Sequence, residues 1–209
     1  MKILPRGLKP RGFSVIMEKN GRGRCKSAGS VPQGRNVMKD AMNVLLTRRS
    51  IRSYKSDPVP EELIEKIIEA GLYAPTGMGL QDPVIIAVTN KEVRDKIAKE
   101  NAAVMGRDSD PFYGAPVILL VAAKACPNAV YDGSCVMDNL LNAAWAMGLG
   151  SCWIHRAKEE LERPFGKELL SSLGIEGEYI GIGHVALGYI EGEPPAPKPR
   201  NDGRVFWVK

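Results

Sequence analysis

The 209-residue sequence contains no long apolar run, only two histidines and no paired cysteine motif. No uninterrupted apolar stretch approaches the 18 residues of a membrane helix, so we expect no membrane span. Cys25, Cys126, Cys135 and Cys152 are widely spaced and form no CxxC pair, which excludes the usual zinc and iron–sulfur spacings. We therefore expect no metal site, and we expect free thiols in a reducing, cytoplasmic compartment.

The glycine motif of classical dinucleotide-binding proteins is also missing. Such proteins carry G-x-G-x-x-G between a strand and a helix. The glycine pairs at 77 and 79, 148 and 150, and 181 and 183 all lack the third glycine at the required offset. A dehydrogenase that binds NAD in this way is therefore a weak hypothesis.

Charge is distributed unevenly along the chain. Residues 1–37 carry nine Lys or Arg and one acid, whereas residues 38–209 carry 20 basic and 23 acidic residues. The composition predicts a basic, disordered extension over 1–37 and one domain over 38–209. The extension is open to interpretation as a nucleic-acid or membrane-surface arm, or as a transit-like segment. We favour a simpler interpretation, in which translation starts at Met38 and the extension is not part of the native protein.

Nucleic-acid binding through this arm is the hypothesis from a different functional class. Single-stranded nucleic acids are usually bound by aromatic side chains interleaved with cations. Residues 1–37 offer only Phe13. We therefore do not expect nucleic acid as a partner.

The most informative segment is residues 47–55, which hold four cations and several hydroxyl groups at the end of a predicted helix. Upstream, an apolar stripe falls on one helical face, which we expect to be buried: Met38, Ala41, Met42, Leu45 and Leu46. Arginine forks beside a serine suit phosphate oxygens. The alternative, a solvated basic helix end favoured by the helix dipole, stays open on these residues alone.

The remaining pattern predicts an α+β domain. Apolar runs predict strands at 84–88, 116–122, 151–155 and 179–190, and periodic segments predict helices from about 61 to 72 and 91 to 104. Residues 105–113 form a polar loop that we expect to shape a pocket rim. Residues 133–147 are apolar nearly all round, which predicts a helix that is buried on every side. Contact with a partner subunit is one way to bury such a helix in a domain of this size.

Four segments, in this order and spacing, resemble the FMN-dependent nitroreductase family over residues 38–209. They are 72–81 (LYAPTGMGLQ), 143–155 (AAWAMGLGSCWIH), 181–189 (GIGHVALGY) and 197–200 (PKPR). The resemblance implies a mixed central sheet flanked by helices, with the long buried helix at a homodimer interface. It also implies FMN at that interface, and an extended tail from Pro194 that lies across the partner.

The resemblance further implies which residues contact the cofactor. Arg48, Arg49 and Ser50 match the phosphate and ribityl end, Arg52 the N1/C2 edge of the flavin, and Lys198 and Arg200 a late phosphate-binding pair. The other implied contacts are Thr76, Met78, Gly79, Gln81, Trp153, Ile154 and His155. The family's usual asparagine and tryptophan after the Ala-Pro-Thr turn are absent here, since Gly79 and Val84 replace them.

By the same resemblance no side chain is catalytic, because flavin N5 carries the chemistry. The implied reaction passes hydride from NADH or NADPH through N5 to a nitroaromatic, a quinone or a similar small acceptor, by a ping-pong mechanism. The altered 79–84 run keeps other flavin reactions open, such as dehalogenation or enone reduction. His155 is a proton donor, a backbone contact to N5 or a merely structural imidazole, and we favour the last two over the proton donor. We expect His184 to be a hydrogen-bonded core residue.

Overall fold

The computed structural model describes residues 35–209, with side chains from residue 41 onward. The predicted basic extension therefore lies outside the described residues up to residue 34. The elements follow in chain order: α1 (Arg35–Thr47), α2 (Glu61–Leu72), the 3-10 turn η1 (Gly77–Gly79), β1 (Pro83–Val88), α3 (Lys91–Met105), β2 (Val117–Lys124), α4 (Ala129–Ala146), β3 (Gly150–Ile154), α5 (Ala157–Glu162), α6 (Pro164–Ser172) and β4 (Tyr179–Gly188). Within these residues, no helix combines the length and the apolar character that crossing a membrane requires.

The four strands form one sheet in the order β1-β2-β4-β3, and each neighbouring pair is antiparallel. The α+β prediction is confirmed. The parallel component expected of a mixed sheet is limited, among the described residues, to an isolated bridge between Ser50 and Ser151. That bridge extends the sheet past β3 with the segment that follows α1.

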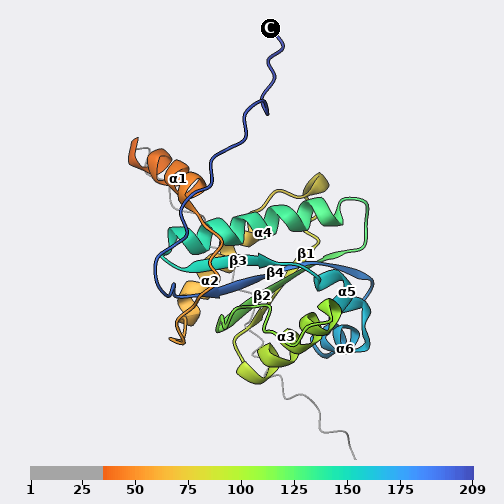
Figure 1. Ribbon diagram of the computed structural model, residues 1–209. Coiled ribbons are helices and arrows are strands. Elements are labelled where there is room, and N and C mark those ends of the chain that lie inside the picture. Colours follow the sequence, from red (N-terminus) through yellow and green to blue (C-terminus); the bar gives the residue numbers. More distant parts are fainter. Residues whose placement is uncertain (1–34) are drawn as a thin grey trace, which may run out of the picture.

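Helices cover both faces of the sheet (Figure 1), with α2 and α4 on one face and α3, α5 and α6 on the other. Strand β2 contributes side chains to the core on both faces of the sheet, because successive side chains of a strand point to opposite faces. Ile118 and Leu120 pack in the core under α3 and α5, whereas Leu119 and Val121 pack under α4. A strand covered on both sides explains the unbroken apolar run at 117–123.

Helix α1 differs from the prediction. It stands apart from the layers beyond one end of α4 (Figure 1), and its apolar stripe is not buried. Leu45 and Leu46 are 58% and 70% exposed, and Met42 is 49% exposed. The prediction that this face is buried within the chain is wrong. Instead, α1 is tied to α4 at one point, where Trp145 Nε1 donates to Thr47 Oγ1 at 3.0 Å.

Helix α4 also departs from its prediction of burial on every side. Its inner face is buried against the sheet and α2, with Met137, Leu140 and Ala144 fully inaccessible. Its other face begins with Val130 and Tyr131, which are 54% and 73% exposed. Within a single chain, α4 is therefore buried on one side.

Candidate functional site

The cationic segment after α1 is held by two buried anchors, Ile51 and Tyr54. The Ile51 amide donates to the carbonyl of Ser151 at 2.9 Å, and the Lys55 amide donates to the carbonyl of Tyr189 at 3.0 Å. Ile51 and Tyr54 point into the core, whereas Arg52 and Ser53, which lie between them, are exposed.

Tyr54 anchors this segment to the sheet. Its hydroxyl donates to the carbonyls of Ile51 at 2.8 Å and Ala186 at 3.2 Å. Burial raises the pKa of Tyr54 well above its usual range, and the nearby Cys152 adds to the shift. The phenol therefore stays protonated and keeps the single proton that the two carbonyls share.

A groove of about 950 Å³ opens along this segment. Arg48, Arg49, Ser50 and Arg52 line one wall, together with Leu45 and Leu46, and residues 195–200 line the other. Among the described residues, the lining contains five cations and no carboxylate. The groove brings together six of the thirteen predicted cofactor residues, including Lys198 and Arg200, which lie 146 or more positions after Arg52 in the chain.

A second pocket, of about 280 Å³, adjoins the groove. It contains three more predicted residues, Trp153, Ile154 and His155, and it is closed by the polar loop expected to form a rim. The two cavities meet where the Arg52 guanidinium lies 5.9 Å from the ring centroid of Tyr113, a cation–π contact. This contact links a residue of the groove to a residue of the pocket.

A buried polar network lies beneath this pocket. Asn101 on α3 donates from Nδ2 to the carbonyl of His155 at 2.9 Å and to Glu160 Oε2 at 3.1 Å. Its Oδ1 accepts from Arg156 Nε at 3.1 Å. Asn101 and Glu160 are completely inaccessible to solvent. The Asn101 side chain thus holds both the backbone and two side chains of the segment that follows β3.

His184 lies at the inner end of the network. It is fully buried, as predicted, and the edge of Phe112 packs against it. Its Nε2 lies 3.4 Å from Glu160 Oε2, yet neither ring nitrogen has a hydrogen-bond partner among the residues that the structure describes. The prediction that His184 lies in the core is therefore confirmed, and the prediction that it is hydrogen-bonded is wrong.

The turn at 76–81 holds the remaining four predicted residues, Thr76, Met78, Gly79 and Gln81. Met78 and Gln81 both have φ of 55°, a left-handed conformation that is uncommon for residues with a side chain. The turn is attached to the start of α4, where the Gly77 amide donates to Asp132 Oδ1 at 3.0 Å. The arginine segment attaches at the other end of α4, about 20 Å away along the helix. The structure does not bring this turn to the groove of its own chain.

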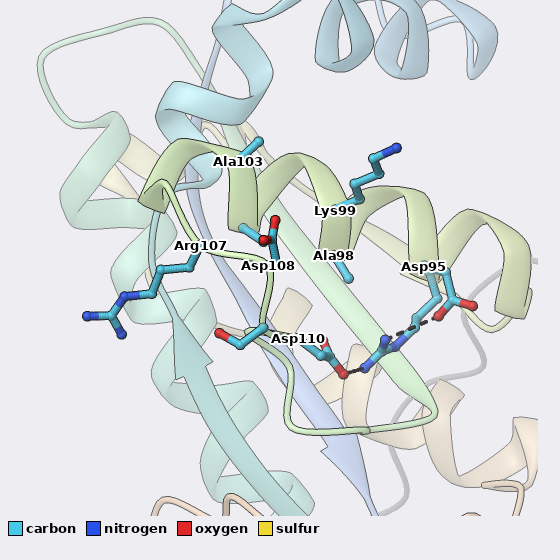
Figure 2. Close-up of a pocket in the computed structure, with 10 residues that line it drawn as sticks. Asp95, Ala98, Lys99, Ala103, Arg107, Asp108 and Asp110 are labelled. Atoms are coloured by element: carbon cyan, nitrogen blue, oxygen red, sulfur yellow. Dashed lines mark hydrogen bonds and ion pairs between the residues drawn. The ribbon is translucent and has the colours of Figure 1, made fainter.

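A third cavity, of about 450 Å³, lies between α3 and the loop that follows it (Figure 2). Three of its charged side chains pair with one another, since Arg94 bonds both Asp110 and Asp95. None of the thirteen predicted residues lines it. The described residues also contain no cluster of three or more His, Cys, Asp or Glu that could hold a metal ion.

The structure adds five site residues that sequence reasoning missed: Asn101, Arg107, Tyr113, Arg156 and Glu160. The polar loop containing Arg107 and Tyr113 was a visible signal, and Arg156 adjoins His155. Nothing in the sequence distinguishes Asn101 or Glu160 from other polar residues on helix surfaces.

Comparison with known proteins identifies the family of the chain. The Nitroreductase family model matches residues 45–189, and the chain belongs to that family. A protein of Archaeoglobus fulgidus, provisionally named NADH dehydrogenase/NAD(P)H nitroreductase, is 31% identical over 160 residues, which cover 75% of this chain and 88% of the relative. FMN reductase [NAD(P)H] of Bacillus subtilis is 28% identical over 75% of this chain and 57% of its own length.

A solved structure agrees as well. The nitroreductase of Bacteroides fragilis, crystallised with bound FMN, superposes with a TM-score of 0.72 and 28% sequence identity. The match covers 81% of this chain and 98% of that protein.

Proposed function

We propose that this protein is an FMN-dependent oxidoreductase that uses NADH or NADPH to reduce a small acceptor such as a nitroaromatic or a quinone. The observation that carries the proposal is the groove, whose lining in the described part of the chain has five cations and no carboxylate. The B. subtilis relative is named an FMN reductase, and the B. fragilis neighbour holds FMN, which supports the assignment.

The residues present fit a phosphorylated flavin. Arg48, Arg49 and Ser50, with Lys198 and Arg200 opposite, offer the planar forks and point charges that bind phosphate oxygens. Arg52 lies at the junction with the apolar pocket, where a fixed cation stabilises negative charge that develops on a bound ring. When bound, the flavin supplies the hydride chemistry at N5, first with NAD(P)H and then with the acceptor, in a ping-pong order.

The backbone beside His155 is suited to contact N5. Asn101 holds the His155 carbonyl on the buried side, and the chain contains no cis peptide among the described residues. In a trans peptide the N–H points opposite to the C=O. The Arg156 N–H therefore points away from the core, on the side where a ligand can accept its hydrogen bond.

We further propose a homodimer in which the turn at 76–81 completes the site of the partner. The groove and the turn attach to opposite ends of α4, so one chain cannot offer both to one cofactor. The exposed stripe of α1 supplies apolar surface for such an interface. Cys126, Cys135 and Cys152 are all free, which supports a cytoplasmic location.

The deciding experiment is an absorbance spectrum of the purified protein, taken before and after anaerobic addition of NADH and then NADPH. We expect oxidised-flavin bands that bleach with a pyridine nucleotide. In Arg52→Ala we expect about tenfold weaker FMN binding, since a charge-assisted hydrogen bond is lost. Lys55→Ala, an exposed cation of the same segment outside the groove, is the control and should bind normally. A colourless protein that FMN does not reconstitute would overturn the proposal.

A further inference from the structure

Arg156 carries the backbone N–H that is suited to contact flavin N5, and its side chain lines the same pocket. Its backbone is left-handed, with φ of 76°, a conformation that costs free energy in a residue with a side chain. Glycine would adopt this conformation without strain. The chain thus tolerates strain at a position that presents both an N–H and a guanidinium to the pocket, which favours a role for the side chain.

The guanidinium of Arg156 is fixed by Asn101. Its Nε donates to Asn101 Oδ1 at 3.1 Å, and the Asn101 amide nitrogen donates in turn to the His155 carbonyl and to Glu160 Oε2. Only one orientation of the amide suits these partners, because a guanidinium can only donate and a carbonyl can only accept. Both amide hydrogens are therefore engaged, and the guanidinium turns away from the pocket only by breaking the bond from its Nε.

The charge of this guanidinium is not neutralised within the described part of the chain. There, the terminal nitrogens of Arg156 make no hydrogen bond or ion pair. Glu160 is fully buried and reaches Arg156 only through Asn101. The pocket lining also contains the carboxylate of Asp110, which already accepts from Arg94 and from two backbone amides. A fixed cation with free donors therefore faces the pocket.

Such a cation matters because the charge of a flavin changes during the reaction. When NAD(P)H passes a hydride to the flavin, two electrons and one proton arrive, NAD(P)⁺ leaves, and the ring gains one negative charge. Half of the residues that line the pocket are apolar or aromatic: Met105, Pro111, Tyr113, Trp153 and Ile154. Apolar walls reduce screening by water, so a cation that is held in place beforehand stabilises the developing charge.

We propose that Arg156 is a catalytic residue of this enzyme, whose guanidinium contacts the flavin ring at the edge beside N5 and stabilises the negative charge of the reduced ring. The inference rests on the proposed flavin-dependent function, and it adds a second cation to Arg52 at the ring. By linkage, a group that binds reduced flavin more tightly than oxidised flavin also raises the reduction potential of the bound flavin.

The test compares the affinities of the purified protein for oxidised and reduced FMN. Arg156→Met removes the charge and keeps an apolar stem, whereas Arg156→Lys keeps a positive charge. We expect Arg156→Met to lower the ratio of reduced-form to oxidised-form affinity about tenfold, which makes the potential of the two-electron couple about 30 mV more negative. Arg156→Lys should recover part of this ratio. Fluorescence titration gives the affinity for oxidised FMN, and anaerobic equilibration with redox dyes gives the potential, so neither measurement needs turnover.

Two other cations supply matched controls. Arg107 also lines the pocket, but it is exposed, and its guanidinium has no hydrogen-bonding partner among the described residues. In Figure 2 its side chain points away from α3. An exposed cation without an anchor stabilises a nearby charge weakly, so Arg107→Met should change the affinity ratio by no more than about threefold. Lys158→Met, at an exposed position on α5 outside the pocket, should leave the ratio as in wild type.

The outcomes separate failure of this inference from failure of the proposed function. An unchanged ratio in Arg156→Met, in a protein that binds FMN and is reduced by NAD(P)H, would overturn the inference and leave the oxidoreductase intact. Equal losses in Arg156→Met and Arg107→Met would also overturn it, because the effect would then come from the overall positive field and not from an anchored group. A purified protein that binds no FMN would overturn the proposed function, and this inference with it.

Discussion

At the scale of single residues, Tyr54 links the cationic segment to the sheet, and its proton makes that link dependent on pH. The folded-state pKa lies above the unfolded value of about 10, because burial disfavours the phenolate. The stabilisation is therefore fully present below about pH 10 and falls as the pH rises beyond it, since only the unfolded chain then releases the proton.

Tyr54→Phe tests this link. The variant loses the hydrogen bonds to Ile51 and Ala186, and we expect its free energy of unfolding to be about 1–2 kcal/mol lower at pH 8. The deficit relative to wild type should shrink between pH 10 and pH 11, as measured by urea unfolding. Tyr131→Phe, at an exposed position, is the control and should show no such trend. A deficit that does not vary with pH would contradict the interpretation.

Asn101 is the second residue whose role can be measured in isolation. Asn101→Ala removes two donated bonds and one accepted bond, and it leaves the buried Glu160 carboxylate without its amide donor. We expect about 3 kcal/mol of destabilisation in urea unfolding, because several buried polar groups lose their hydrogen-bond partner. Asn139→Ala, which loses a single bond to the Ala70 carbonyl, should cost about 1 kcal/mol. Equal losses of unfolding free energy in the two variants would show that the Asn101 network stabilises the fold no more than a single hydrogen bond does.

At the scale of elements, the contact between β4 and α5 sets the position of Arg156. A Cβ added at Gly181 would lie 2.2 Å from the carbonyl oxygen of Ala157, the first residue of α5. Gly181→Ala must therefore displace backbone, and we expect about 3 kcal/mol of destabilisation. At Gly71 the added Cβ would meet only the flexible ends of Leu140 and Ile85, so Gly71→Ala should cost less than about 1 kcal/mol. Thermal unfolding and calorimetry of both variants check the contrast.

The elements also show which parts of the fold the sequence can predict. The four strands were predicted close to their observed bounds, because each is a local apolar run covered on both faces. The apolar stripe of α1 led to a wrong prediction of burial, since periodicity identifies an apolar face without identifying what covers it. In the site, Arg48–Arg52 form a local motif, whereas Asn101 meets His155, Arg156 and Glu160 from 54 to 59 positions away. No local pattern encodes such a contact.

At the scale of the whole molecule, the two halves of the candidate site lie at opposite ends of α4. The arginine groove is linked to the last turn through Thr47 and Trp145, and the strained turn is linked to the first through Gly77 and Asp132. In a closed two-fold dimer each groove can meet the other chain's turn, which yields two equivalent sites. The strain at Met78 and Gln81 is consistent with a turn that is shaped for a ligand.

Complementation between two defective subunits tests this arrangement directly. Arg52→Ala disables the groove, and Gln81→Ala disables the turn, so each homodimer should bind FMN weakly. When both are co-expressed, half of the dimers are mixed, and each mixed dimer has one site built entirely from intact parts. We therefore expect about a quarter of the wild-type sites to bind FMN tightly in a fluorescence titration. If both halves of a site belonged to one chain, every chain in the mixture would still carry a defect, and tight binding would stay absent.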